Sequence, residues 1–162
     1  MAGIRLTDLL VVAAVFGADR ASKLLITRIL QPGEVVEVTP FFNLVLVHNP
    51  GVSFGLLSGL GAVAPWLLVV LALVISALLV QWGRRETRPV ARLALWTILG
   101  GALGNVYDRV RFGAVVDYLD FHVGDWHWPA FNLADVAVVG GVLWLLVETV
   151  TDRRPDVGRA ER

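Results

Sequence analysis

Residues 65–82 read PWLLVVLALVISALLVQW and contain no charged side chain. A helix needs about 20 mostly apolar residues to cross the roughly 30 Å hydrocarbon core of a bilayer. Pro65 stands in the first turn of the expected helix, where proline is tolerated. This stretch therefore predicts a transmembrane helix, and the rest of the chain can be compared with it.

Three further stretches approach the same length and apolarity, at residues 7–26, 90–109 and 132–151. The whole chain is 56% hydrophobic and only 17% charged, with a mean hydropathy of +0.69. Soluble domains carry about 25% charged residues. We predict an all-α integral membrane protein with four transmembrane helices, forming a single domain over residues 1–162.

The first of these stretches has the length of a signal peptide, but we interpret it as a retained helix. It lacks a clear cleavage site of small residues, and it ends in Asp19, Arg20 and Lys23. A secretory signal peptide would have a basic start and a small-residue cleavage motif. We therefore count residues 7–26 among the transmembrane helices.

The segments between the spans differ in character. Residues 34–47, EVVEVTPFFNLVLV, alternate in part and are rich in valine and phenylalanine, which predicts strands. Residues 54–64 are apolar but too short to span, so we expect a short helix along the membrane surface. The strands and this helix lie in the outer loop 28–64, and residues 110–131 form the second outer loop. Residues 152–162 are a polar cytoplasmic tail.

Basic residues are divided unequally between the two sides of the predicted bundle. Cytoplasmic segments of membrane proteins carry an excess of arginine and lysine. On one side only Arg28 and Arg111 lie outside the predicted helices. The other side carries Arg5, Arg84, Arg85, Arg88, Arg92, Arg153, Arg154, Arg159 and Arg162. We predict that both termini are cytoplasmic.

With this orientation, the unusual polar residues gather at the outer face of the membrane. They come from the outer ends of three helices and from both outer loops: Asp19, Lys23, Asn49, Asn105, Asp108, Arg109, Asp117, Asn132 and Asp135. The cytoplasmic face is expected to carry arginines only. Ionisable groups inside a membrane are costly and usually functional. The pattern predicts a site at the outer leaflet.

Several of these residues also have a structural interpretation. Asp19 and Lys23 are four residues apart with the acid first, the favourable order for a helix ion pair. Asn132 can cap the last helix, with Asp135 as its partner in a capping box. A Gly-x-x-x-Gly pair, Gly100 and Gly104, favours close helix packing. The sequence leaves the structural and the functional interpretations open.

Other catalytic chemistries have weaker support. The chain has no cysteine, which excludes thiolate metal sites and a cysteine nucleophile. HVGDWH, residues 122–127, lacks the spacing of a zinc site, so we expect no metal. Ser22 beside Lys23 suggests a serine–lysine dyad, but neighbouring helix positions point about 100° apart. Ser53 has no evident base.

Two alternatives to an enzyme remain. Carboxylates in a membrane also serve proton relays in small transporters, whose polar groups lie near the midplane. An assembly protein would tolerate replacement of the aspartates. A cluster at one face favours an enzyme over a transporter.

Five stretches in the same order resemble the motifs of the lipoprotein signal peptidases, also called signal peptidase II. They are DRASK (19–23), NPGVSFG (49–55), GGALGNVYDR (100–109), GAVVDYLDF (113–121) and FNLADVAV (131–138). The resemblance covers nearly the whole chain. The family's second motif often reads Asn-x-Gly-Ala-Ala-Phe, whereas Val52 and Ser53 replace the alanines here.

The resemblance implies a membrane aspartic peptidase of the bacterial cytoplasmic (inner) membrane. Such enzymes remove signal peptides from diacylglyceryl-modified prolipoproteins, cutting just before the lipidated cysteine. Asp117 and Asp135 match the catalytic pair, whereas Asp19 and Lys23 match a more structural motif. Residues that match substrate-binding or supporting positions are Asn49, Gly51, Asn105, Asp108, Arg109 and Asn132. We expect a monomer that contacts membrane lipid, with no cofactor and no nucleic acid partner.

Overall fold

The computed structural model describes residues 3–51 and 63–151. In chain order, the elements are α1 (Leu6–Ile29), β1 (Val35–Thr39), β2 (Phe42–Asn49), α2 (Ala64–Gly83), α3 (Pro89–Phe112), β3 (Val115–Val123), β4 (Trp126–His127) and α4 (Leu133–Thr151).

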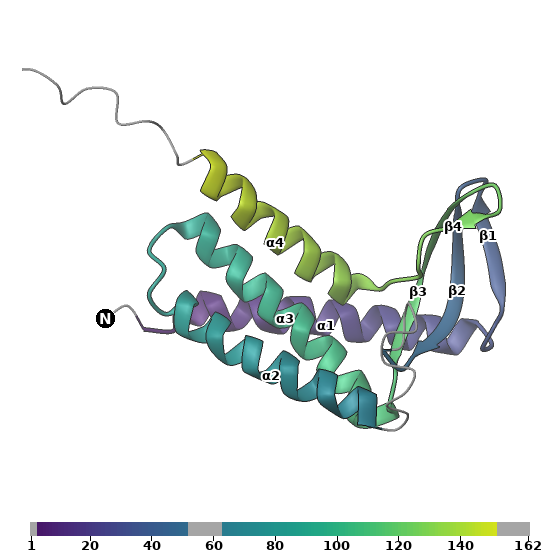
Figure 1. Ribbon diagram of the computed structural model, residues 1–162, viewed down its shortest axis with the longest axis horizontal. Helices are drawn as coiled ribbons and strands as arrows, with labels where there is room; N and C mark the ends of the chain where they lie inside the picture. The colour runs from purple at the N-terminus through teal and green to yellow at the C-terminus, as the bar shows by residue number, and fades with distance from the viewer. Residues whose placement is uncertain (1–2, 52–62, 152–162) are drawn as a thin grey trace, which may run out of the picture.

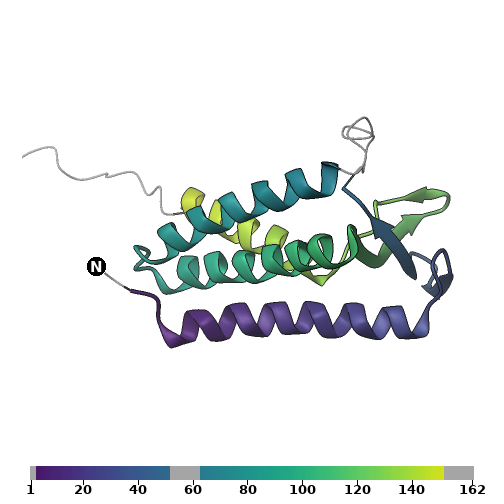
Figure 2. The same ribbon diagram turned by 90° about the horizontal axis from the view of Figure 1, so that it is seen from below.

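The four helices run along the long axis of the molecule, and the strands lie across one end of them (Figure 1). Residue 3, the α2–α3 connection and the end of α4 all lie at the opposite end (Figures 1 and 2). The first and last described segments therefore lie on the same side of the bundle, as the predicted topology requires.

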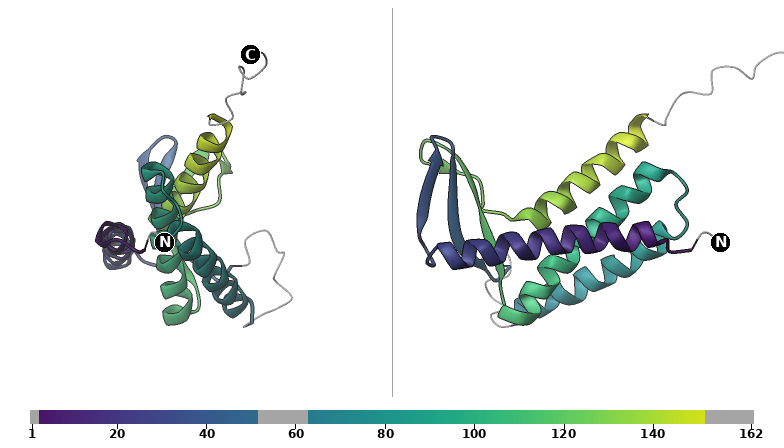
Figure 3. Two further views of the ribbon diagram at one scale, coloured as in Figure 1. Left: turned by 90° about the vertical axis from the view of Figure 1, so that its left-hand side faces the viewer. Right: turned by 180° about the vertical axis from the view of Figure 1, so that it is seen from behind.

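Helix α3 is the centre of the bundle. It packs against each of the other three helices, and the view along the bundle shows them arranged around it (Figure 3). Two of its glycines allow close approach: Gly100 faces Val12 and Val15 of α1, and a Cβ on Gly104 would lie 2.5 Å from Asp19 Oδ2. The predicted packing role of this glycine pair is confirmed.

Only α2 and α4, among the described helices, are long and apolar enough to span a membrane by their own composition, with mean hydropathies of 2.4 and 1.9. Helices α1 and α3 have 24 residues each, about 36 Å at 1.5 Å per residue. They exceed the core thickness in length but carry more charge. Much of that charge is buried between the two helices, at Asp8, Asp19, Lys23, Arg92 and Asp108.

The predicted helix positions agree with the structure to within three residues at each end. Helix α1 continues past the predicted end at Ile26, and α3 continues past Arg109 to Phe112. Gly113 ends α3 in the left-handed region, with φ 74°, and its N–H donates to Arg109 O. The expected surface helix at 54–64 and the tail 152–162 fall almost wholly on residues outside the described ranges.

The strands form one antiparallel sheet in the order β1-β2-β3-β4. The predicted strands at 34–47 are confirmed as β1 and β2. Strands β3 and β4 were not predicted, since residues 110–131 were expected to form a loop. β3 pairs along β2, with Asp117 opposite Val47 and Val115 opposite Asn49. The sheet therefore carries Asn49 and Asp117 on neighbouring strands.

Two sets of contacts, one apolar and one between backbones, help to hold the sheet against the bundle. Ile26 of α1 and Leu30, the residue just after this helix, pack with Leu46, Val116 and Tyr118 in a buried apolar cluster. The segment before α4 is joined to β3, because Phe131 N donates to Leu119 O at 3.0 Å and Phe131 O accepts from both Tyr118 and Leu119. This second set of contacts fixes the start of α4 against the strand that carries Asp117.

Candidate active site

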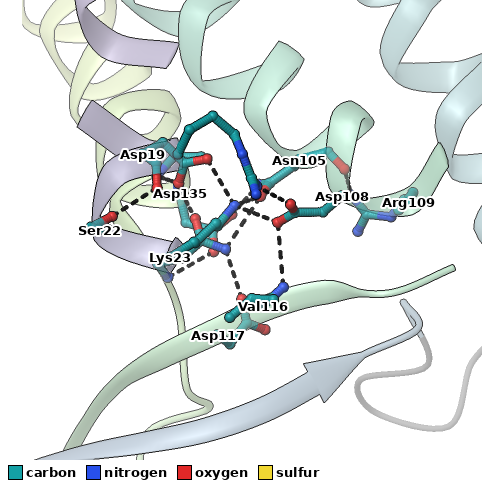
Figure 4. Close-up of polar contacts among 12 residues, drawn as sticks. Asp19, Ser22, Lys23, Asn105, Asp108, Arg109, Val116, Asp117 and Asp135 are labelled. Carbon is teal, nitrogen blue, oxygen red and sulfur yellow. Dashed lines mark hydrogen bonds and ion pairs between the residues drawn. The ribbon is translucent and has the colours of Figure 1, made fainter. Parts of the chain in front are cut away.

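The predicted polar residues converge where α1, α3, β3 and the start of α4 meet (Figure 4). Asp19 and Lys23 come from α1, Asn105, Asp108 and Arg109 from α3, and Asp135 from the first turn of α4. The structure therefore brings together side chains that lie more than a hundred residues apart in the sequence.

Asp117 is held on β3 with only 3% of its surface exposed. Asn49 Nδ2 donates to its Oδ2 at 2.9 Å, and Asn132 Nδ2 donates to its Oδ1 at 2.7 Å. Burial is the largest cause of a raised pKa at Asp117; together with the opposing hydrogen bond from Asn49 and the neighbouring charge of Asp135, it brings this pKa to about 6. A carboxyl group with this pKa keeps its proton to a higher pH than an ordinary aspartate.

Asp135 accepts hydrogen bonds from two asparagines. Asn105 Nδ2 donates to its Oδ1 at 2.8 Å, and the backbone N–H of Asn132 donates to its Oδ2 at 3.2 Å. In return, Asn132 Oδ1 accepts the backbone N–H of Asp135 at 3.0 Å. The predicted capping box is present. Its asparagine also binds Asp117, so the cap fixes the two carboxyl groups relative to each other.

A groove of about 410 Å³ opens beside Asp135 and continues along α4. Apart from Asp135, its lining is apolar or aromatic, and it includes Trp128, Phe131, Val139 and Leu143. Asp117 does not line this groove. Asp135 is therefore accessible to a ligand in the apolar groove, whereas Asp117 is enclosed by Asn49 and Asn132.

Lys23 is the centre of an ion network behind the carboxyl pair. Its Nζ lies 2.9 Å from Asp19 Oδ2 and 2.7 Å from Asp108 Oδ2, and it donates to Asn105 Oδ1 at 3.0 Å. The side chains of Lys23, Asp19 and Asp108 are each at most 1% exposed. The predicted ion pair is confirmed, and Asn105 connects it to Asp135.

Asp108 does not contact Asp117 or Asp135 through a hydrogen bond in the described part of the chain. It pairs with Lys23 and Arg20, and its Oδ2 accepts the backbone N–H of Val116 at 3.4 Å. Because Val116 precedes Asp117, Asp108 positions the strand. Arg20 was missed by the sequence analysis. It belongs to the DRASK motif, but no local pattern relates it to a carboxylate on another helix.

Tyr118 is a second residue that the sequence analysis missed. Its hydroxyl donates to Ser22 Oγ at 2.7 Å and is hydrogen-bonded to the backbone of Leu133. Ser22 Oγ in turn donates to Asp19 O at 2.9 Å. Tyr118 thereby joins α1 to the start of α4.

Ser22 and Lys23 have separate partners, so the suggested serine–lysine dyad does not form. Ser53 lies outside the described residues.

Arg109 and Gly51 lie at the edge of the cluster. Arg109 donates from Nη1 to Asn105 O at 3.3 Å, and its charge acts on both Asp117 and Asp135. Its buried Nε has no hydrogen-bond partner within residues 3–51 and 63–151. The Gly51 N–H donates to Asn49 Oδ1 at 2.8 Å, and its φ of 91° favours glycine. A Cβ there would collide with Leu68 and approach Arg109 Nη2.

The opposite end of the bundle corrects one prediction. This end, which the sequence analysis assigned to the cytoplasm, was expected to carry arginines only, but Asp8 pairs with Arg92 here, and both are buried. Arg92 Nη1 also donates to Gly83 O at 2.7 Å and to Glu86 O at 3.1 Å. The pair ties α1 to the α2–α3 connection. It was missed because the sequence shows no link between residues so far apart.

The two histidines of the β3–β4 hairpin stack on each other, and one of them is hydrogen-bonded to Asp120. His122 and His127 stack with ring centroids 4.9 Å apart, and His127 Nδ1 lies 2.9 Å from Asp120. Asn43 also donates to Asp120, at 2.9 Å. Within the described residues, no cluster of three or more histidine or acidic side chains is placed to hold a metal ion.

Comparisons with known proteins identify the family of a chain with this fold and this cluster of polar residues. A family model for signal peptidase II matches residues 11–151. The chain belongs to the signal peptidase II family. It is therefore a membrane aspartic peptidase of the class that the five motifs indicated, and the predicted resemblance is confirmed.

Curated members of the signal peptidase II family align over most of the chain. The lipoprotein signal peptidase of Burkholderia thailandensis is 44% identical over 134 residues, which are 80% of this chain and 79% of that protein. The lipoprotein signal peptidase of Aeromonas hydrophila is 43% identical over 161 residues, 96% and 94% of the two chains.

Solved structures support the same fold for this signal peptidase II. A bacterial membrane enzyme structure at 2.3 Å resolution superposes with a TM-score of 0.84 and 26% identity, over 99% of this chain and 98% of the other. A second, at 1.9 Å resolution, has a TM-score of 0.80 and 28% identity, over 94% and 99%. The chain thus shares both fold and length with membrane enzymes.

Proposed function

We propose that this enzyme removes the signal peptide from diacylglyceryl-modified prolipoproteins, cutting just before the lipidated cysteine, with Asp117 and Asp135 as its catalytic pair. The observation that carries the proposal is the shared asparagine. Asn132 donates to Asp117 from its side chain and to Asp135 from its backbone, which fixes two carboxyl groups beside an apolar groove.

We further propose that all four helices span the bacterial cytoplasmic membrane as one domain, with both termini in the cytoplasm. The distribution of arginines supports this orientation. The burial of most α1 and α3 charges in pairs supports it too, because paired charges can be accommodated in a membrane interior. The carboxyl pair then lies at the outer leaflet. A monomer surrounded by lipid is consistent with this arrangement.

The chemistry follows from two carboxyl groups that share one proton. The ionised group removes a proton from the attacking water while the protonated group donates its proton to the carbonyl oxygen, which gives a tetrahedral diol. The proton taken from water then passes to the leaving nitrogen as the C–N bond breaks, and a diol hydroxyl returns a proton to the group that had donated one. The shared proton belongs to the pair rather than to either residue. Burial of Asp117 favours retention of this proton.

The surroundings suit an extended, lipid-bearing peptide. The groove along α4 would receive apolar substrate next to Asp135. Arg109 Nε, which has no hydrogen-bond partner among the residues that the structure describes, would donate to a substrate carbonyl. Asn49 and Gly51 would border the substrate on the same side as Arg109. Asn105 and Asn132 would hold the carboxyl groups during the reaction.

The requirement for lipid tests this proposal. Purified enzyme is given a diacylglyceryl-modified prolipoprotein and the same precursor without lipid, and kcat/KM is measured for each. The lipidated precursor is expected to be cut at least about a hundredfold more efficiently, because the buried apolar area of even one acyl chain contributes several kcal/mol. Equal cleavage of the two precursors would contradict the proposal.

The pH dependence of cleavage provides a second prediction. Because the pair must retain one proton, kcat/KM is expected to fall as the pH rises past the upper pKa of the pair, which is about 6 for Asp117. Asn49→Ala removes a hydrogen bond to the Asp117 carboxylate and should move this decline about one pH unit higher.

Asn43→Ala is the matched control for the pH profile. Asn43 lies on the same strand and donates to Asp120 instead of Asp117. Its replacement should leave the decline where it is in the wild type. A profile that moves equally in both variants, or in neither, would show that Asn49 does not set the titration of the pair.

A further inference from the structure

A second groove, of about 590 Å³, runs between α1 and α3 and does not include either aspartate of the pair. Its walls are apolar and aromatic side chains from both helices, among them Leu9, Ala13, Phe16, Leu103 and Tyr107. The lining residues from Leu103 to Arg111 rise about 12 Å along α3. This is a little less than half of the roughly 30 Å hydrocarbon core.

At its end near the sheet, the lining of the groove changes from apolar to basic. Arg111 lines it there, in the last turn of α3, and is exposed. Its guanidinium lies 5.8 Å from the Phe112 ring, and it makes no ion pair within the described ranges. Arg20 lies over the Tyr107 ring at 4.5 Å. Arg20 is paired with the buried Asp108, so the unpaired positive charge at this end, the mouth of the groove, comes from Arg111.

We propose that this groove binds an anionic phospholipid of the outer leaflet, with one acyl chain between α1 and α3 and the phosphate at Arg111, beside Arg20. The inference rests on the orientation given with the proposed function, which places Arg111 at the outer surface. Apolar walls match an acyl chain, and a guanidinium matches a phosphate geometrically and electrostatically.

The charge at the mouth favours this occupant over two others. A second copy of the chain, packed symmetrically through the same groove, would bring its own Arg111 to the mouth and add repulsion. The helix of a signal peptide carries its basic residues at the cytoplasmic end and brings no anion to the outer side. A phospholipid supplies both the apolar chain and the negative charge.

The site is also connected to the carboxyl pair. Arg20 at the mouth pairs with Asp108, which binds Lys23 and the backbone N–H of Val116, the residue before Asp117. A phosphate beside Arg20 therefore interacts with the same network that positions β3. Bound lipid is expected to stabilise the folded enzyme as well as to remain attached during purification.

Lipid retention measured by native mass spectrometry tests the inference. Enzyme is exchanged into micelles with equal amounts of phosphatidylglycerol and phosphatidylcholine, and the lipids that stay bound are counted. The wild type should retain phosphatidylglycerol preferentially. Arg111→Gln should reduce that preference about fivefold, the equivalent of about 1 kcal/mol for one basic residue beside an anionic headgroup.

Ala13→Phe tests the groove itself, because it fills the apolar part without changing the charge. It should remove the preferential retention. Two controls match these variants. Arg28→Gln removes the other exposed arginine of the outer side, and Ala14→Phe adds a ring at an exposed neighbour that does not line the groove. Both controls should retain lipid as the wild type does.

Three results would overturn the inference. They are an unchanged preference in Arg111→Gln, an equal loss in Arg28→Gln, and unchanged retention in Ala13→Phe. The outcome is independent of catalysis, since Asp117→Asn should bind lipid like the wild type. If the wild type retains the lipid as expected but cuts no prolipoprotein, the proposed peptidase reaction fails and the lipid site stands.

Discussion

Replacing either Asp117 or Asp135 by asparagine is expected to reduce prolipoprotein cleavage by about a thousandfold or more. An asparagine cannot take a proton from water or deliver one to the leaving nitrogen, and each step is required. The change preserves size, and both side chains already accept hydrogen bonds from asparagines. Initial rates with purified variants and a lipidated precursor measure the effect.

Asp120→Asn is the matched control for these variants. Asp120 lies on the same strand as Asp117, is also buried, and binds Asn43 and His127. Its replacement should leave cleavage within a few-fold of the wild type. If Asp120→Asn lost as much activity as Asp117→Asn, the loss would reflect the strand and its packing rather than the chemistry of a carboxyl pair.

Lys23→Met is expected to have the largest effect on stability. The change leaves Asp19 fully buried with no cation beside it and takes one of two cations from Asp108. Breaking a buried ion pair from one side typically lowers the free energy of unfolding by about 3–5 kcal/mol. Thermal or denaturant unfolding in detergent, followed by tryptophan fluorescence, should show a loss of this size.

Two comparisons sharpen the stability prediction. Lys23→Met combined with Asp19→Asn should be more stable than Lys23→Met alone, since the remaining carboxylate, Asp108, keeps Arg20. Arg28→Met removes an exposed cation from the same helix and should change stability by at most about 0.5 kcal/mol. A Lys23→Met protein as stable as Arg28→Met would show that the buried network contributes little.

The helices could be predicted because a long run of apolar residues, which a helix needs to cross a membrane, is visible locally in the sequence. Residues 65–82 identified α2 with an error of one residue at each end. The composition of α1 and α3 is less apolar, and the reason is now clear. Their charges face each other inside the bundle, at the Asp8–Arg92 pair and at Lys23 with its two carboxylates. The Asp19–Lys23 pair has a local signal in its spacing of four residues, but the pairs between α1 and α3, Asp8–Arg92 and Lys23–Asp108, join residues 84 or more positions apart and leave none.

The candidate site was predictable as a set of residues but not as an arrangement. Asp117 was expected in a loop, whereas it lies on β3, whose pairing with β2 brings it beside Asn49. The Asn132–Asp135 spacing predicted a cap or a functional pair, and the structure combines the two. Arg20 and Tyr118 act through contacts between helices and strands, which only the fold reveals.

The most direct test of the account is the mass of the products made from a diacylglyceryl-modified prolipoprotein. The wild type should release an intact signal peptide and leave a product whose first residue is the lipidated cysteine. Asp117→Asn and Asp135→Asn should leave the precursor at its full mass. A cut at another bond, or the same products from either variant, would contradict an aspartate pair that acts at this position.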